Sequence, residues 1–366
     1  MIRGRQLPSA ELEVKRQERA QTHQIITAHV TPLAVNASWT GQPMPVELAT
    51  VRVVSKPWGV CNLQPWSGVN GLTDPVGELW FERADQPVQS SALLLKLLFT
   101  SEPLSIQVHP DDSFAQAMGM PNGKTEAWYI LSAESGAQVG IGLTRQITSQ
   151  HLGSSIDDGS IADLINWQPV AKDDVIYIPA GTIHAIGAGI VLAEIQQRSD
   201  TTFRLFDFGR HRELDKDNGV AAADLKPLGA PQKPIRLTTA RTVLICGPHF
   251  ILERIDLAQN SSWALLAEAE TWIFVIGGHA AVGLTAVSIG QTIFVSGGRT
   301  SIEVGAGGLT GLIAYPANAP VASLLQRLGE GAGNAGHSPG SVFPHFTRPT
   351  GLLDLTGTND CSEAHA

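Results

Sequence analysis

Short apolar runs, interrupted at close intervals by glycine and proline, constrain the fold of this chain more than any other feature. Of its 366 residues, 37 are glycine and 22 are proline. That frequency suits the tight turns of an all-β architecture better than it suits long helices. We therefore predict a mainly β fold. The runs in the first half of the chain are GELWF (77–81), SALLLKLL (91–98), LSIQVH (104–109), EAWYIL (126–131), DVIYIPAG (174–181) and GIVLAEIQQ (189–197).

Only two stretches of this half are predicted to be short helices. The first, SFAQAM (113–118), follows residues that favour helix N-caps at 111–113, and Gly119 is suited to end it. The second is SIADLINW (160–167).

A proline- and glycine-rich segment, KPLGAPQK (226–233), separates two β-rich halves, and this suggests a duplicated barrel. Similar runs follow it, among them HFILERIDL (249–257), ETWIFVIGG (270–278) and LTGLIAYP (309–316). We predict four parts: an N-terminal extension with a helix over Glu11–Gln24 (1–48), a first β domain (49–230), a second β domain (231–320), and a short helix, VASLLQRL, with a flexible tail (321–366).

Composition and charge exclude several functions. The net charge is −9 and no basic stripe is present, which argues against a nucleic-acid partner but allows a small anionic ligand in a local pocket. No apolar run is long enough to cross a membrane, and the N-terminus lacks an apolar signal core. Cys61, Cys246 and Cys361 lie far apart, which predicts neither a disulfide framework nor a thiolate zinc site. We expect a cytoplasmic protein.

The run at 104–109 carries polar residues of the kind that bind ligands. Because alternate side chains of a strand share a face, Ser105, Gln107 and His109 point one way while the aliphatic residues between them point the other. A polar face of this kind suits a barrel strand that lines a cavity. Taken alone it is weak, because a single histidine at a strand end is more often a surface or hydrogen-bonding residue.

Two further segments strengthen the case for a metal site. GKTEAWYIL supplies Lys124 and Glu126 at the start of a strand, and the turn in IPAGTIH directs His184 back toward a barrel mouth. With Gln107 and His109 they offer an amide, two imidazoles and a carboxylate, a set that suits a catalytic zinc with an open position. Separately, Glu126 could be a surface carboxylate and His184 a turn histidine.

Four motifs resemble those of the type I phosphomannose isomerases, zinc-dependent enzymes of the cupin superfamily. They are QVHPDD, GKTEAWYIL, IPAGTIHAIG and EIQQRSDTTFRLFDFGR, and KPWG (56–59) and GELW (77–80) fit the same family. The resemblance covers residues 50–215 strongly and the second half only by pattern. It implies two cupin-type jelly-roll β-barrels with a few short helices.

The resemblance also implies an activity and a set of metal ligands. One zinc ion would be held by Gln107, His109, Glu126 and His184. The reaction would interconvert mannose 6-phosphate and fructose 6-phosphate by proton transfer through a cis-enediol(ate). The second half holds His249 and His279 without a clustered ligand set, so we expect it to bind no metal.

Further roles follow from the resemblance and from residue type. Arg204 would lie over the reacting carbons, and Glu194 would be an acid/base or an orienting carboxylate, although the two could instead form a surface pair. Lys96, Ser105 and Lys124 are the best phosphate donors. Lys96 could also face outward from an exposed sheet, and Lys124 could instead move the proton.

Two other functions remain open at this point. A non-catalytic sugar-phosphate-binding cupin, a sensor or accessory protein, would need the lysines but not Arg204 and Glu194. An iron-dependent cupin oxygenase is disfavoured, because an amide takes one ligand position here. Arg198 departs from the small polar residue that is usual in the family. Oligomeric state, pathway and breadth of aldose use are not predicted.

Overall fold

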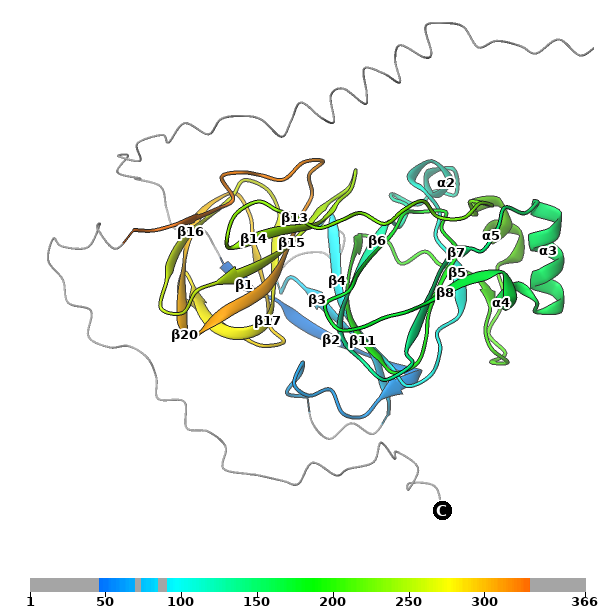
Figure 1. Ribbon diagram of the computed structural model, residues 1–366, viewed down its shortest axis with the longest axis horizontal. Helices are drawn as coiled ribbons and strands as arrows, with labels where there is room; N and C mark the ends of the chain where they lie inside the picture. The colour runs from blue at the N-terminus through cyan, green and yellow to red at the C-terminus, as the bar shows by residue number, and fades with distance from the viewer. Residues whose placement is uncertain (1–45, 70–73, 85–90, 330–366) are drawn as a thin grey trace, which may run out of the picture. The chain divides into compact units, whose positions relative to one another are not determined.

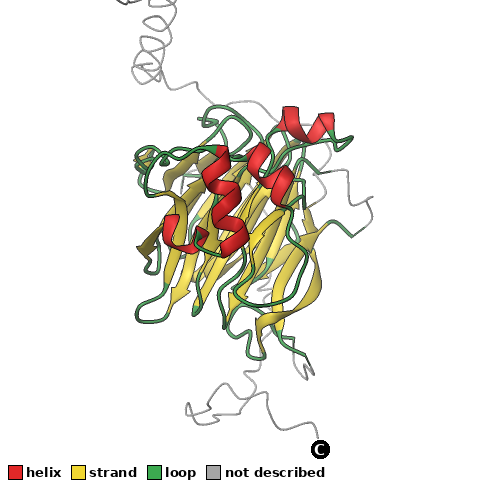
Figure 2. Ribbon diagram, turned by 90° about the vertical axis from the view of Figure 1, so that its right-hand side faces the viewer, coloured by secondary structure: helices red, strands yellow, loops and turns green. Residues whose placement is uncertain are grey.

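The protein is described by a computed structural model over residues 46–69, 74–84 and 91–329. These residues form three antiparallel sheets and four short helices, so the prediction of a mainly β fold is confirmed. Figure 1 shows the strands of the two halves, and Figure 2 shows that the helices gather on one side of the strands.

Two facing sheets build the first half as a cupin-type jelly roll. Ile130 and Leu192 of one sheet and Val139 and Ile186 of the other belong to one buried cluster, although the sheets do not join into a closed barrel. The six-stranded sheet has the order β2 (Thr50–Val60), β3 (Val76–Glu82), β4 (Leu93–Thr100), β11 (Ile190–Gln197), β6 (Glu126–Ala133), β9 (Val175–Ile178). The five-stranded sheet has the order β12 (Phe203–Phe206), β5 (Ile106–Val108), β10 (His184–Ile186), β7 (Gln138–Leu143), β8 (Ile165–Pro169).

The second half is a ten-stranded sheet that encloses its own core. Its longest strands, β17 (Thr271–Val282) and β20 (Gly298–Tyr315), change register near Gly277 and Gly278, and the φ of +75° at Gly278 favours glycine there. The remaining strands are β1 (Val46–Leu48), β13 (Ile235–Arg236), β14 (Arg241–Cys246), β15 (Ile251–Leu257), β16 (Ser262–Ala267), β18 (Thr285–Ser288), β19 (Thr292–Val295) and β21 (Leu325–Arg327).

Strand β4 lies between two cores, which explains its unbroken apolar run. All eight of its residues are buried. Leu95 and Leu97 join a cluster that includes Phe274 of the second half, whereas Leu98 belongs to the core between the two sheets of the first half. Lys96 shares the face of Leu98, because alternate residues of a strand point to the same side. A strand covered on both faces reads as continuously apolar.

The helices cover the outer face of the five-stranded sheet. Leu152, Ile156 and Ile161 share a buried cluster with Ile106 and Val108 of β5. Helix α2 (Asp112–Ala117) is as predicted, with Asp111 accepting a hydrogen bond from the Phe114 amide, but only the first part of 160–167 is helical, in α4 (Ile161–Leu164). Helices α3 (Ser149–Asp158) and α5 (Lys216–Ala222) were not predicted.

Three expectations are corrected. The helix predicted over 321–328 is wrong, because this segment forms edge strand β21, whose Leu325 is buried opposite Leu265. Residues 46–48 are not an appendage, since β1 pairs with β19. Cys61 is disulfide-bonded, which the cysteine spacing did not lead us to expect. The predicted helix at Glu11–Gln24 and the tail beyond residue 329 lie outside the described residues.

Among the residues that the structure describes, no helix combines the length and apolar character needed to span a bilayer.

Candidate active site

Three buried side chains converge between the sheets of the first half. His109 follows β5, Glu126 begins β6 and His184 begins β10, and together they form a group that can hold a metal ion. The Nε2 atoms of His109 and His184 each lie 3.4 Å from a different oxygen of Glu126. The exposed fraction of each side chain is 1% or less. The alternative interpretations, in which Glu126 is a surface carboxylate and His184 a surface histidine in a turn, are therefore wrong.

Backbone carbonyls fix both imidazole rings. Nδ1 of His109 lies 2.8 Å from the Thr201 oxygen, and Nδ1 of His184 lies 2.8 Å from the Thr182 oxygen. A proton on each Nδ1 satisfies these contacts and leaves the Nε2 lone pairs directed at Glu126. Such a second hydrogen bond is the usual support for a metal-bound histidine.

The centre of the group contains buried polar atoms that lack partners. Within the described part of the chain, neither His109 Nε2 nor Glu126 Oε1 has a hydrogen-bond partner. Burying such atoms without compensation is costly, at about 1–3 kcal/mol or more for each group. A divalent cation bound to both imidazoles and the carboxylate would remove that cost, so these residues fit a metal.

Gln107 lies at the edge of the group and faces the cavity. It pairs with His184 between β5 and β10, and its Nε2 lies 3.2 Å from His184 Nε2. Ser105 Oγ is 3.2 Å from Gln107 Oε1. The amide nitrogen and oxygen have nearly the same shape, so turning the amide by 180° would place its oxygen beside the histidines. Gln107 can thus supply a fourth ligand.

The charge states of the group are those that metal binding needs. Burial, reinforced by the positive charge of Lys124, lowers the pKa of His109 to about 3, and burial also lowers the pKa of His184. Burial alone would raise the pKa of Glu126, but Lys124 and His109 together hold it well below its ordinary value. Near neutral pH the imidazoles are therefore neutral and the carboxylate is ionised.

A cavity of about 260 Å³ adjoins the group through Gln107 and Lys124. It brings together six of the residues identified from the sequence, and they are Lys96, Ser105, Gln107, Lys124, Glu194 and Arg204. Trp58, Leu98, Leu104 and Ile186 contribute apolar walls. Five cationic and three acidic side chains face this small volume, which suits an anionic, polar ligand.

Two lysines lie between the acidic groups of the cavity. Lys124 Nζ is 2.9 Å from Glu126 Oε2 and 3.7 Å from Glu194 Oε1. Lys96 Nζ is also 3.7 Å from Glu194 Oε1 and is 3.1 Å from Asp200 Oδ1. Lys96 is only 4% exposed, so the alternative of an outward-facing lysine is wrong.

Glu194 has an environment that favours proton exchange. Burial, with the nearby charge of Glu126, raises its pKa to about 7 even though Lys124 and Lys96 oppose the shift. Trp128 Nε1 lies 3.3 Å from Glu194 Oε2. A carboxyl group that titrates near neutral pH can both accept and return a proton.

Arg204 reaches the same cavity from β12, where it pairs with Gln107. Its Nη1 donates to the Glu213 carbonyl at 2.9 Å, and its buried Nε lacks a partner among the described residues. Because Glu194 is 4% exposed inside the cavity, the two residues are not a surface ion pair.

Several cavity residues were not predicted from the sequence, and these are Lys56, Glu78, Asp200, Thr202 and Arg212. Lys56 and Glu78 belong to KPWG and GELW, which were recognised as motifs without being given roles. Arg212 lies beyond the quoted motifs, and its Nε donates to Asp207 at 2.8 Å.

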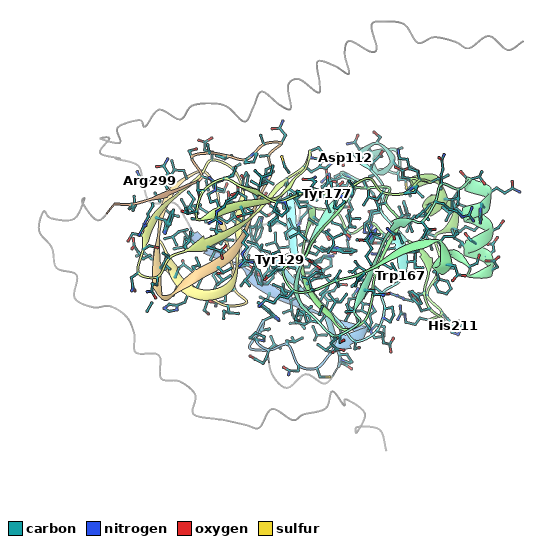
Figure 3. All side chains as sticks on the ribbon, viewed as in Figure 1. Asp112, Tyr129, Trp167, Tyr177, His211 and Arg299 are labelled. Atoms are coloured by element: carbon teal, nitrogen blue, oxygen red, sulfur yellow. The ribbon has the colours of Figure 1, made fainter. Side chains whose placement is uncertain are left out.

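Tyr129, beside Trp128 on β6, does not line the cavity. It points to the second half of the protein, where Arg254 Nη1 donates a hydrogen bond to its hydroxyl at 2.8 Å (Figure 3).

Comparisons with known proteins agree with the resemblance in the motifs. No family model matches the chain. The mannose-6-phosphate isomerase of Streptococcus mutans is 36% identical over 196 residues, which are 50% of this chain and 62% of that protein. A mannose-6-phosphate isomerase of Bacillus subtilis is 41% identical over 119 residues, 32% of this chain and 38% of that protein. The matches therefore span less than two thirds of these relatives.

The fold is shared with solved structures over a longer stretch. The mannose 6-phosphate isomerase from Bacillus subtilis aligns with a TM-score of 0.65 and 23% identity, covering 74% of this chain and 99% of that one. The apo form of the enzyme from Salmonella typhimurium aligns with a TM-score of 0.60 and 16% identity, over 74% and 99% of the two chains. The resemblance to phosphomannose isomerases is thus confirmed in sequence and in fold.

Proposed function

We propose that this protein is a zinc-dependent isomerase that interconverts mannose 6-phosphate and fructose 6-phosphate. One observation carries the proposal: a buried group of His109, Glu126 and His184 adjoins a small charged cavity that is lined by Glu194 and Arg204. A carboxyl that exchanges a proton can serve as the base of an aldose–ketose isomerisation, and a metal site and a fixed cation can stabilise the negative charge that develops on the sugar oxygens.

The metal would be held by Gln107, His109, Glu126 and His184. Two imidazoles and one carboxylate are the protein ligands of some catalytic zinc sites, and an amide in a further ligand position disfavours the iron sites that are built on the same three ligand types. The unpartnered Nε2 of His109 and Oε1 of Glu126 support this assignment. When bound, zinc supplies Lewis-acid stabilisation of negative charge on the sugar oxygens.

Glu194 is the group that we assign to proton transfer between C1 and C2 of the open-chain sugar. With a pKa of about 7 it can take the proton from one carbon and return it to the other. Burial lowers the pKa of Lys124, but Glu126 and Glu194 more than reverse this, and the pKa lies above its ordinary value. Lys124 therefore keeps its proton, which leaves it a poorer base than Glu194.

Arg204 would stabilise the cis-enediolate that forms when the proton leaves carbon. Its guanidinium is fixed through the Glu213 carbonyl, and its Nε has no competing partner among the described residues. A preorganised donor that meets developing charge lowers the barrier without reorganisation during the reaction.

The phosphate would be bound by Ser105 and Lys124, with additional positive charge from Arg212 at the same cavity. Lys96, the third donor suggested by the sequence, would reach a phosphate only by giving up one of its carboxylate partners. Binding of the phosphate at these residues would orient the sugar carbons toward Glu194 and Arg204.

A coupled assay with mannose 6-phosphate tests the function directly. We expect turnover by the purified protein, its loss after chelation, and its recovery when zinc is added back. Sugar-phosphate binding without turnover in the zinc-loaded protein would instead favour the sensor or accessory protein. Activity that survives complete removal of the metal would contradict the zinc assignment.

A further inference from the structure

Side chains of alternating charge form a row that begins at Glu126 of the candidate metal group. The row passes through Lys124 to Glu194. Beyond Glu194, the row continues through Lys96 to Glu78, whose Oε2 lies 3.7 Å from Lys96 Nζ, and ends at Lys56, whose Nζ lies 3.0 Å from Glu78 Oε1. The function proposed above gives no role to Glu78 or Lys56.

Glu78 is held by partners from its own strand, β3, and from the two strands beside it. Besides Lys56 of β2 and Lys96 of β4, Trp80 of β3 donates its Nε1–H to Glu78 Oε2 at 2.6 Å. Burial would raise the pKa of Glu78, but the two lysines bring it below its ordinary value, so Glu78 is ionised at neutral pH. Its exposed fraction is 8%, and it is a fixed negative charge in the cavity wall.

Lys96 is therefore enclosed by three carboxylates. Its ammonium has three donor hydrogens, and the oxygens of Glu78, Glu194 and Asp200 lie at 3.7, 3.7 and 3.1 Å from Nζ. The indole ring of Trp80 lies 4.0 Å from Nζ and covers another side of the ammonium. Asp200 is the nearest carboxylate to Lys96 but is 65% exposed, whereas Glu78 is buried. Because solvent screens a buried charge less, Glu78 is the more constant of the two negative charges that draw Lys96 away from Glu194.

We propose that Glu78 is a positioning residue that holds Lys96 at a set distance from Glu194. With Glu78 in place, Lys96 shares its charge among three carboxylates and leaves Glu194 free to exchange a proton. With Glu78 neutralised, Lys96 would turn toward Glu194 and form a close ion pair, which weakens Glu194 as a base. This inference rests on the function proposed above.

Steady-state kinetics of Glu78→Gln test the inference, with Glu82→Gln as the matched control. Glu82 lies on the same strand and pairs with Arg52 at 3.2 Å, outside the cavity lining. We expect Glu78→Gln to lower kcat by about 10- to 100-fold, since small displacements of reacting groups cost this much, with little change in KM. Metal content should be unchanged, and the control should retain normal kcat.

A second variant keeps the test decisive if Glu78→Gln does not fold. Trp80→Phe retains a ring beside Lys96 but removes the donor to Glu78, and we expect a smaller fall in kcat at unchanged KM. A normal kcat in the folded variant, or a rise in KM alone, would overturn the inference. Absence of isomerase activity in the wild-type protein would instead refute the underlying function, so the two failures are distinguishable.

Discussion

The two halves of the protein differ in how completely their buried carboxylates are hydrogen-bonded. In the second half, Arg241 and Glu253 are 2% and 0% exposed and form a two-bond ion pair, with Nε and Nη2 at 2.8 and 2.7 Å from the carboxylate oxygens. Tyr315 also donates to Glu253, and Arg241 donates to the Val321 carbonyl. Both carboxylate oxygens of Glu253 are therefore satisfied by protein groups.

In the first half, an equally buried carboxylate, that of Glu126, is only partly paired. Glu126 is as buried as Glu253, yet its Oε1 has no hydrogen-bond partner in the described part of the chain, and neither has Nε2 of His109. Since unpaired buried polar atoms are costly and uncommon, each calls for an explanation. A buried ion pair whose polar atoms all have protein partners, as at Glu253, indicates a structural role. A buried group that has unpartnered polar atoms, as at Glu126, indicates a site where a ligand supplies the missing contacts.

The largest expected effect comes from removing an imidazole of the incomplete group. His109→Ala or His184→Ala should abolish both metal content and isomerase activity, because each takes away one of the few ligands. Elemental analysis and the coupled assay measure the two quantities. His249→Ala, in the second half, is the control and should keep both. Stoichiometric metal in either site variant would make the ligand assignment wrong.

The next largest effect is expected at Arg204. Arg204→Ala should lower turnover by on the order of 100- to 1000-fold, as does loss of one preorganised charge-stabilising donor. Substrate binding should weaken much less, and metal content should stay intact. Arg204→Lys should rescue only partly, because an ammonium lacks the paired donors of the planar guanidinium. Normal kcat with a raised KM would place Arg204 in the binding set and revive the sensor-like function.

Removal of the substrate phosphate tests the charged cavity as a whole. Free mannose should be a poor substrate, with kcat/KM lower by roughly 10- to 100-fold for each charge-assisted hydrogen bond lost, at about 1.5–3 kcal/mol. Turnover should fall as well as affinity, because binding energy from the phosphate positions the reacting carbons. Comparable efficiency on mannose and mannose 6-phosphate would count against Ser105 and Lys124 as phosphate donors.

The pH dependence reports on Glu194. As a base it must be ionised, and burial raises its pKa above the ordinary value, so kcat/KM should fall as the pH drops through this raised pKa. A single protonation predicts a slope approaching tenfold per pH unit on the acid side. A profile that stays level down to pH 5.5 would argue that another group moves the proton.

The smallest effect on activity is expected from the satisfied ion pair of the second half. Arg241→Ala leaves Glu253 buried without its partner, which costs about 3–5 kcal/mol of unfolding free energy. The kcat of the folded fraction should remain normal, since Arg241 lies outside the cavity. Chemical denaturation and the coupled assay measure the two effects. Loss of activity in a folded Arg241→Ala protein would contradict the conclusion that the ion pair of the second half has only a structural role.

Residues close together in sequence were the easiest to assign. The alternation of Ser105, Gln107 and His109 and the turn before His184 are local patterns, and the structure brings these residues together as the sequence suggested. The unbroken apolar run of β4 also marked a strand, but its second covering layer comes from residues more than 150 positions away, such as Phe274.

Features that depend on distant partners could not be predicted. Glu78 pairs with Lys56 and Lys96, which lie on neighbouring strands, and no local pattern specifies those pairings. Likewise, the segment at 325–327 has helix-compatible residues but becomes a strand because the edge of β16 is available to it. Tertiary context overrides local propensity at such edges.

We have proposed that the incomplete group of the first half, His109, Glu126 and His184, is a zinc site. Anomalous diffraction at the zinc absorption edge, on crystals of the active protein, tests it most directly. We expect one strong peak among His109, Glu126 and His184, at about 2.0–2.1 Å from the histidine nitrogens. Active protein whose crystals give a peak elsewhere, or no peak at this group, would contradict it.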